Sequence, residues 1–327
     1  MFGNWVNPAE FGLFLRKFRR DSDLFRRATK KLSRDEDTRV KESWAAIERP
    51  GNWWEIPMVQ LRWNGMMTGD PTKNHFDYIA EKFLSGRPAL RALSLGCGAG
   101  AKERRWAETD RFERIDAYDV AQVAIKKAQE DIRASKYSNV VFYSVGNALT
   151  LDLPKDHYDM IIFDHSLHHF SPMEALLLRV RESMKTKGLI VASEFVGPSR
   201  FQWTSRQLEV VNGLLSVFPK EYLSLWNSPL PRLPAWRPSK LSMWLSDPSE
   251  SVESSHIIPL LHKHFNVVEQ KGYGGAILHL LFAGIAHHFI NPDQTAEQML
   301  RFCFDVEDLL LQTGDIGHDF ALIIANK

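Results

Sequence analysis

From about residue 90 the chain alternates short apolar segments with amphipathic ones, and this alternation limits the folds that it can adopt. Five apolar segments have the length and composition of strands: residues 92–95, 114–119, 140–145, 158–163 and 188–195. Strands that alternate with helices over short connections predict a parallel sheet covered by helices on both faces.

Two helices of this region carry recognisable sequence signals. Ser171-Pro172-Met173-Glu174 has the pattern of a capping box with Pro at the first helical position, so a helix is expected to begin there. After the second strand, the apolar residues that fall on one helical face are Ala121, Ala124, Ile125, Ala128 and Ile132.

The last third of the chain extends the pattern. Residues 265–270 and 320–325 are further strand candidates, and Asn291-Pro292-Asp293-Gln294 starts a helix between them. The residues expected on the buried face of that helix are Met299, Phe302, Cys303, Val306 and Leu310. We therefore predict an α/β fold with a mostly parallel, seven-stranded sheet and helices on both faces.

The first 50 residues look helical and strongly basic. Asn7-Pro8-Ala9-Glu10 is a helix start, and Phe11, Phe14, Leu15 and Phe18 repeat on one face among arginines and lysines. Such a helix can make peripheral contact with an anionic membrane or dock on its own protein, and the sequence leaves both alternatives open.

The segment 219–248 holds six of the 16 prolines together with three tryptophans, which predicts a packed cap instead of a long regular element. We therefore divide the chain into four parts. These are an N-terminal helical segment and partial lid (1–88), a core (89–200), an inserted cap (201–264) and a segment that completes the sheet (265–327).

Composition excludes several classes of protein. A net charge of +1 argues against a large nucleic-acid footprint. Cys97 and Cys303 can build neither a disulfide framework nor a multi-cysteine zinc site, so we expect a reducing compartment and predict no metal site. No apolar run approaches the roughly 20 residues of a membrane-spanning helix, and the start lacks a signal-peptide pattern. A cytoplasmic location follows as the expectation.

A glycine-rich turn, Gly96-Cys97-Gly98-Ala99-Gly100, lies between the first strand and the following helix. Glycines there permit a tight turn and bring backbone N–H groups close to a ligand at a helix N-terminus. Asp119 ends the next strand, where a carboxylate can accept hydrogen bonds from both hydroxyls of a ribose. The two features together predict a nucleoside-containing cofactor.

The segment Leu93-Ser94-Leu95-Gly96-Cys97-Gly98-Ala99-Gly100 resembles the glycine motif of class I methyltransferases, which use S-adenosylmethionine (SAM) and have a Rossmann-like fold. The resemblance continues in order through Asp119, Gly146-Asn147-Ala148, residues 158–163 and residues 167–170, and it covers about residues 90–196. The flanking segments, residues 53–57 and 194–203, resemble those of uncharacterised bacterial small-molecule methyltransferases.

The resemblance implies SAM as cofactor and S-adenosylhomocysteine as its product. It places the glycine turn against the methionine moiety, Asp119 on the ribose and Asn147 on the adenine amino group. The residues that it implies in cofactor binding are Gly96, Cys97, Gly98, Gly100, Asp119, Val120, Asn147, Ala148 and Asp164.

One position departs from the family pattern. Ser94 stands where the family often has an acid that anchors the amino group of the cofactor. Glu103, one turn into the following helix, either substitutes for that acid or is an exposed helix residue beside Lys102 and Arg104.

Two other functions remain alternatives. Gly96-x-Gly98-x-x-Ala101 also satisfies the relaxed fingerprint of an NAD(P)-dependent oxidoreductase. A catalytically inactive SAM-binding subunit would keep Asp119 and Asn147 without turning over.

Chemistry on the methyl acceptor is expected at the carboxyl ends of the fourth and fifth strands, where Asp164, His165, His168, His169 and Glu194 lie. Methyl transfer to a hydroxyl or an amine needs alignment and removal of a proton, and a histidine is suited to that step. We predict His168 or Glu194 as the base, with a packing role for the histidine pair as the alternative.

Tryptophans precede and follow the core, among them Trp53, Trp63, Trp203 and Trp226. Such residues either frame a pocket for a small-molecule acceptor, such as a saccharide or secondary metabolite, or pack the cap onto the core.

Overall fold

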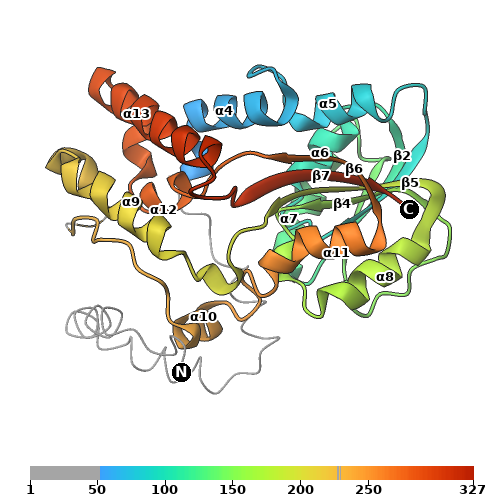
Figure 1. Cartoon of the computed structure of the whole chain (residues 1–327). Helices are drawn as coiled ribbons and strands as arrows, with labels where there is room; N and C mark the ends of the chain where they lie inside the picture. The colour runs from blue at the N-terminus through green and yellow to red at the C-terminus, as the bar shows by residue number, and fades with distance from the viewer. Residues whose placement is uncertain (1–51, 227, 229) are drawn as a thin grey trace.

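The computed structural model describes residues 52–226, 228 and 230–327 (Figure 1). The basic helix expected within the first 50 residues lies outside the described part of the chain, so its role stays a prediction. The described residues form a central sheet with helices packed on both of its faces (Figure 1).

The sheet contains seven strands in the order β3-β2-β1-β4-β5-β7-β6. Their bounds are β1 Leu90–Leu95, β2 Phe112–Asp119, β3 Val141–Val145, β4 Tyr158–Asp164, β5 Met184–Phe195, β6 Asn266–Gly272 and β7 Phe320–Asn326. The first five strands pair in parallel, whereas β7 lies antiparallel between β5 and β6. The predicted α/β fold with a mostly parallel seven-stranded sheet is confirmed.

The order of the strands reverses at β1, which has β2 on one side and β4 on the other. In open parallel sheets such a reversal leaves a crevice beyond the carboxyl ends of the strands. The glycine turn after β1, Asp119 at the end of β2 and Asp164 at the end of β4 all lie at this edge. The topology thus brings together residues from three separate strands.

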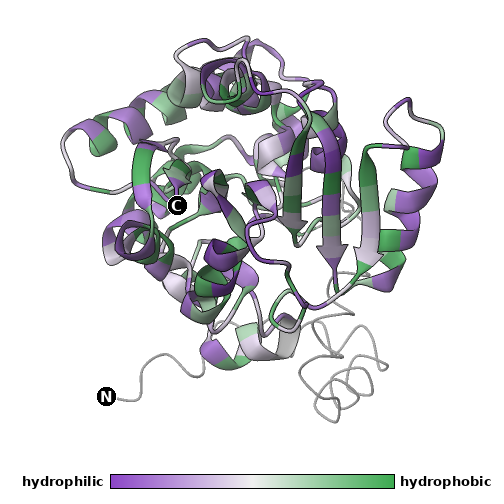
Figure 2. Cartoon of the chain, turned by 90° about the vertical axis from the view of Figure 1, so that its right-hand side faces the viewer, coloured by the Kyte–Doolittle hydropathy of each residue, from purple (hydrophilic) through white to green (hydrophobic). Residues whose placement is uncertain are grey.

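Two hydrophobic clusters separate the sheet from its helices. The first cluster includes residues of α4 (Pro57–Thr68), α5 (His75–Lys82), α6 (Ala101–Ala107) and α7 (Gln122–Arg133), together with residues of three later helices. The helices of the second, on the opposite face, are α8 (Met173–Ser183) and α11 (Ile257–His264) (Figure 1). Figure 2 shows peripheral helices with hydrophobic residues toward the sheet and hydrophilic residues outward.

The apolar stripe of α7 explains its packing. Ile125, Ala128 and Ile132 are buried at helical spacing, as the sequence predicted. The remaining helices are α9 (Ser205–Val217), α10 (Lys240–Ser246), α12 (Leu278–Leu281) and α13 (Gln294–Gln312). Short 3-10 turns are η1 (Trp53–Glu55), η2 (Leu167–His169), η3 (Ser199–Phe201), η4 (Lys220–Leu223), η5 (Ser254–His256) and η6 (Ala286–Phe289).

The expected buried face of α13 was partly wrong. Phe302 is 54% exposed, although Cys303 and Leu310 are buried as predicted. The buried stripe of the helix runs through Ala296, Leu300, Cys303, Glu307 and Leu310. These positions are three or four residues apart and therefore lie on one face of the helix, whereas Phe302 lies outside that buried face.

The capping box predicted at Ser171 is also wrong. The N-cap of α8 is Pro172, which makes no side-chain cap, and the Ser171 hydroxyl donates instead to Glu253 Oε1 at 2.6 Å. Glu253 Oε2 accepts from the backbone N–H of Met173 at 3.0 Å. A carboxylate from a distant segment therefore caps this helix, which no local sequence pattern can reveal.

Strand β5 begins at Met184, four residues before the start expected at Gly188. Met184 pairs with Tyr158 at the start of β4, and the register then shifts, so that the next pair is Leu189 with Met160. Among the described residues, no helix is both long and apolar enough to cross a bilayer.

Candidate functional site

The glycine turn after β1 adopts a conformation that only glycine tolerates. Gly96, Gly98 and Gly100 have φ angles of +79°, +52° and +77°. A Cβ on Gly96 would lie 2.7 Å from Cβ of Ser166, and one on Gly100 would lie 2.5 Å from the ring of Tyr143. The bare backbone at Gly96 therefore forms part of a cavity wall.

Asp119 joins this turn to the end of β2. Its Oδ2 accepts from the Gly98 N–H at 2.9 Å, and its Oδ1 accepts from the Ala121 N–H at 2.8 Å. Burial raises the pKa of Asp119, and the backbone hydrogen bonds oppose that shift. A carboxylate has about four lone-pair sites, so Asp119 retains acceptor capacity for two further donors.

A cavity of about 520 Å³ runs along the carboxyl ends of the strands. This volume is in the range of small-molecule sites. The lining residues are Gly96, Tyr118, Asp119, Val120, Val145, Gly146, Asn147, Ala148, Leu149, His165, Ser166, His169, Phe170, Ser171, Arg200, Pro248, Ser249 and Val252.

Five of the predicted cofactor residues line this cavity: Gly96, Asp119, Val120, Asn147 and Ala148. The other predicted cofactor residues, Cys97, Gly98, Gly100 and Asp164, do not line it. Oδ1 of Asn147 accepts from the Leu149 N–H at 2.9 Å, which orients the side-chain amide.

Asp164 lies enclosed between Lys102 and His75. The Lys102 ammonium donates to Asp164 Oδ1 at 2.7 Å, and Nε2 of His75 lies 3.4 Å from Oδ2. Burial alone would raise the pKa of Asp164, but Lys102 and His75 hold it well below its usual range. Asp164 is therefore a fixed negative charge at the edge of the sheet.

Ser94 is paired with the acid that sequence analysis considered as a substitute. The Ser94 hydroxyl donates to Glu103 Oε1 at 2.7 Å. Glu103 is only 2% exposed, so the alternative of an exposed helix residue is wrong. Burial raises the pKa of Glu103 to about 7, and its Oε2 is buried without a hydrogen-bond partner among the described residues.

His168 and Glu194 form a buried pair where β4 and β5 end. Glu194 is fully enclosed, and its Oε2 lies 2.6 Å from Nδ1 of His168. Its Oε1 accepts from the N–H groups of Ser166 and Leu167, both at 2.7 Å. Burial opposes protonation of His168, but Glu194 and Glu250 raise its pKa above the usual value.

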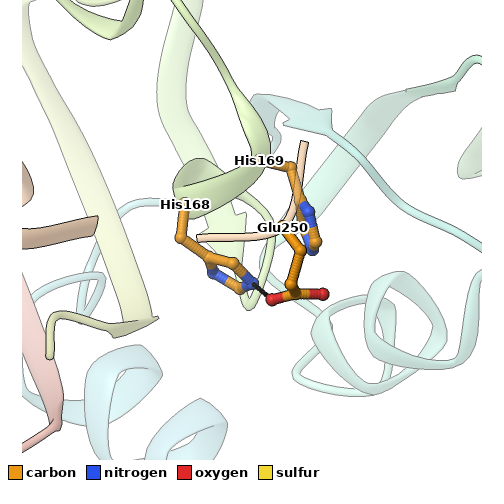
Figure 3. Close-up of side chains that lie close together, drawn as sticks. All are labelled: His168, His169 and Glu250. Atoms are coloured by element: carbon orange, nitrogen blue, oxygen red, sulfur yellow. Dashed lines mark ion pairs between the residues drawn. The ribbon is translucent and has the colours of Figure 1, made fainter. Parts of the chain in front are cut away.

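The second ring nitrogen of His168 faces Glu250. Nε2 of His168 lies 3.7 Å from Oε1 of Glu250, and the ring of His169 lies beside both groups (Figure 3). Burial lowers the pKa of His169 well below its usual value, so this imidazole is neutral near pH 7.

Residues 87–225 match a family model described as a methyltransferase domain. The strand order and the site geometry described above agree with that match. The chain carries a class I SAM-dependent methyltransferase domain. Because the matching model is that of a methyltransferase, the alternative of a nicotinamide-dependent oxidoreductase loses its support.

A ubiquinone/menaquinone biosynthesis C-methyltransferase of Shewanella frigidimarina is 26% identical over 116 residues, which are 35% of this chain and 46% of that relative. The chain thus aligns with less than half the length of this curated relative.

Two solved structures are similar at lower identity. A phosphoethanolamine N-methyltransferase of Haemonchus contortus is 14% identical, with a TM-score of 0.48 over 83% of this chain and 56% of that one. A SAM-dependent methyltransferase of Mesorhizobium loti is 17% identical, with a TM-score of 0.45. The match covers 78% of this chain and 99% of that one.

The segment 201–264 contributes part of the cavity wall through Pro248, Ser249 and Val252. Trp53 and Trp203 are buried in the first hydrophobic cluster, so both pack the core. Trp226 and Trp244 are 45% and 38% exposed.

Sequence analysis missed several residues of this site. His75, Arg200 and Glu250 come from segments outside the motifs of the methyltransferase domain, and only the tertiary fold brings them to the cavity edge. Lys102 lies two residues after the glycine turn, at the start of a helix. Of the missed residues, it is the one whose position near the site could have been inferred from the sequence.

Proposed function

We propose that the chain transfers the methyl group of SAM to a hydroxyl, or to an amine, of a small molecule that enters the cavity. The observation that carries the proposal is the buried contact of 2.6 Å between His168 and Glu194 at the edge of the sheet where the cavity lies. A histidine held in this way is suited to take up a proton near neutral pH.

The described residues fit the cofactor. The turn at Gly96 excludes side chains, so a ligand can approach the backbone closely. Asp119 is placed to accept from ribose hydroxyls, and the amide of Asn147 offers a donor and an acceptor to an adenine edge. SAM, when bound, supplies a methyl group that is already activated on a sulfonium.

The chain must align the acceptor and remove its proton. With SAM and an acceptor bound, Nε2 of His168, which lies beside the lining residue His169, would take up the proton of the acceptor hydroxyl. Full burial and three hydrogen bonds support Glu194 as a positioning residue that orients His168.

The lining of the cavity supports a polar acceptor, such as a saccharide or a secondary metabolite. Arg200, Ser171 and Ser249 contribute polar groups beside the aromatic faces of Phe170 and Tyr118.

The test begins with calorimetry, in which S-adenosylhomocysteine should bind and NADH should not. Incubation of SAM with polar metabolites, followed by mass spectrometry, then identifies an acceptor that gains a methyl group. Binding without transfer to any acceptor would favour the alternative of an inactive SAM-binding subunit.

With an acceptor in hand, His168→Ala should lower turnover by roughly 10²–10⁴ while affinity for S-adenosylhomocysteine is kept. Glu194→Gln should move the acid limb of the pH–rate profile to lower pH, because the Glu194 carboxylate raises the pKa of His168. An unchanged profile would exclude the positioning role, since a residue that only packs would alter stability instead.

A further inference from the structure

We propose that His168, His169 and Glu250 bind a divalent transition-metal cation at the edge of the cofactor cavity. Each of these residues offers one ligand atom, and the three atoms lie within 4.8 Å of one another. Figure 3 shows the two imidazoles, which follow β4, beside the carboxylate of the inserted segment. Sequence analysis predicted no metal site. Glu250 lies far from the histidine pair along the chain, so no spacing motif connects the three residues.

The distances require only a small adjustment. Ligands of one cation with bonds of about 2.0–2.2 Å lie roughly 3–3.5 Å apart. Nε2 of His168 and Oε1 of Glu250 are 3.7 Å apart. Since the three ligand atoms lie within 4.8 Å of one another, the side chains must approach by up to roughly 1–2 Å to close around a cation.

Glu194 gives His168 the surroundings of a metal-bound histidine. The contact of 2.6 Å between Nδ1 and the buried Glu194 engages that nitrogen, so Nε2, which faces Glu250, is the nitrogen that a cation could bind after displacing any proton there. Metal-binding histidines are commonly fixed by such a carboxylate on their other nitrogen.

His169 and Glu250 complete the set of ligands. The ring centroids of His168 and His169 are 4.1 Å apart, so the two imidazoles and the Glu250 carboxylate form one compact group.

The ligand types select the class of metal. Two imidazoles and one carboxylate suit Zn²⁺ or Fe²⁺, whereas Mg²⁺ and Ca²⁺ prefer oxygen ligands. Three protein ligands also leave a position open, as in catalytic metal sites. His169 lines the cavity together with Ser166 and Ser249, so that position is accessible to an acceptor oxygen.

This site goes beyond the proposed function. Nε2 of His168 has one lone pair, so it cannot bind a proton and a cation at once. Proton uptake by His168 therefore applies to the metal-free protein, and cation binding to the metal-loaded protein. In the loaded protein the cation would lower the pKa of a bound acceptor hydroxyl.

The test is calorimetry of the full chain, stripped of metal by a chelator, with ZnCl₂ as the titrant. We expect one equivalent to bind, and MgCl₂ to give no heat. Glu250→Gln and His169→Ala should each weaken zinc binding by at least about tenfold, and Glu194→Gln by about 10–100-fold. The matched control is His262→Ala, which removes an exposed histidine of α11 and should leave zinc affinity unchanged.

Absence of zinc binding by the wild-type chain, or equal affinity in Glu250→Gln and His169→Ala, would overturn the site. Binding of S-adenosylhomocysteine verifies that each variant is folded and tests the cofactor site separately. A further measurement needs no variant: anomalous scattering at the zinc edge from crystals of the wild-type protein should locate the cation among His168, His169 and Glu250. A peak elsewhere would also overturn the site.

Discussion

At the scale of single residues, the site is built from buried charged groups whose partners fix their protonation. Asp164 is held ionised by Lys102 and His75, whereas burial raises the pKa of Glu103 to about 7. These opposite outcomes follow from the closer polar partners of Asp164, Lys102 and His75, because burial acts on both carboxyls in the same direction.

Asp119 gives the most direct test of the cofactor site. Asp119→Ala should weaken binding of S-adenosylhomocysteine by about 1.5–3 kcal/mol, or roughly 10–150-fold, because hydrogen bonds to a charged acceptor are lost. Calorimetry measures the change. Glu113→Ala, which removes a half-exposed carboxylate of the same strand, serves as the control and should bind as the wild type does.

Glu103 should make stability depend on pH. Its pKa in the folded protein is about 7 and its ordinary value is 4.5, so between these values the folded state binds more protons than the unfolded state. Stability contributed by the neutral carboxyl is therefore present below pH 4.5 and is lost as the pH rises through 7. The full effect is on the order of 3 kcal/mol.

Urea unfolding at pH 5.5 and pH 8 measures this loss. Glu103→Gln keeps the shape of the side chain without the charge, so its stability should fall less between the two pH values. Burial also raises the pKa of Asp319 to about 7. Asp319 therefore contributes its own loss of stability with rising pH in both the wild type and Glu103→Gln. An identical loss in wild type and variant would contradict the assignment.

At the scale of elements, buried carboxylates hold helices that the local sequence does not fix. Glu253 caps α8 in place of the predicted capping box. Glu307 of α13 accepts from the N–H groups of Ile277 and Leu278 at the start of α12, and from Arg62 of α4 at 2.8 Å. One side chain thus connects three helices.

Glu307→Ala should lower the free energy of unfolding by about 3–5 kcal/mol, because it leaves the buried Arg62 and several N–H groups without this acceptor. Asp308→Ala is the matched control. Asp308 contacts the same arginine at 2.5 Å, but its side chain is 42% exposed, so the expected loss is about 1 kcal/mol or less. Urea denaturation of both variants measures the difference, and equal losses would refute the connecting role.

At the scale of the whole molecule, the cavity joins the core of the methyltransferase domain to the segment inserted after β5. Gly96 and Asp119 belong to the core, whereas Pro248, Ser249 and Val252 belong to the insertion. A ligand that fills the cavity should therefore slow the opening of both regions.

Hydrogen exchange with saturating S-adenosylhomocysteine measures this effect. We expect protection at residues 118–121, 146–149 and 248–252, while α13 (Gln294–Gln312), none of whose residues lines the described cavity, stays unchanged. Protection confined to the core residues would show that the insertion does not close over the cofactor.

Local patterns were sufficient for much of the architecture. The alternation of strands and helices, the stripe of Ile125, Ala128 and Ile132, and the glycine turn depend on periodicity and backbone sterics, which act between residues close in sequence. Asp119 and Asn147 could be placed because Asp119 ends one predicted strand and Asn147 comes two residues after the next, and the resemblance to methyltransferases implied the role of each.

The tertiary structure decided which of these residues meet. The register that places Asp164 opposite Ser193 brings Glu194 to the loop after β4, where it binds His168. Glu103, Glu250 and Glu253 have partners set by packing between elements. Long-range contacts leave no periodic trace in a single sequence, because burial and charge pairing depend on the neighbours that only the folded chain supplies.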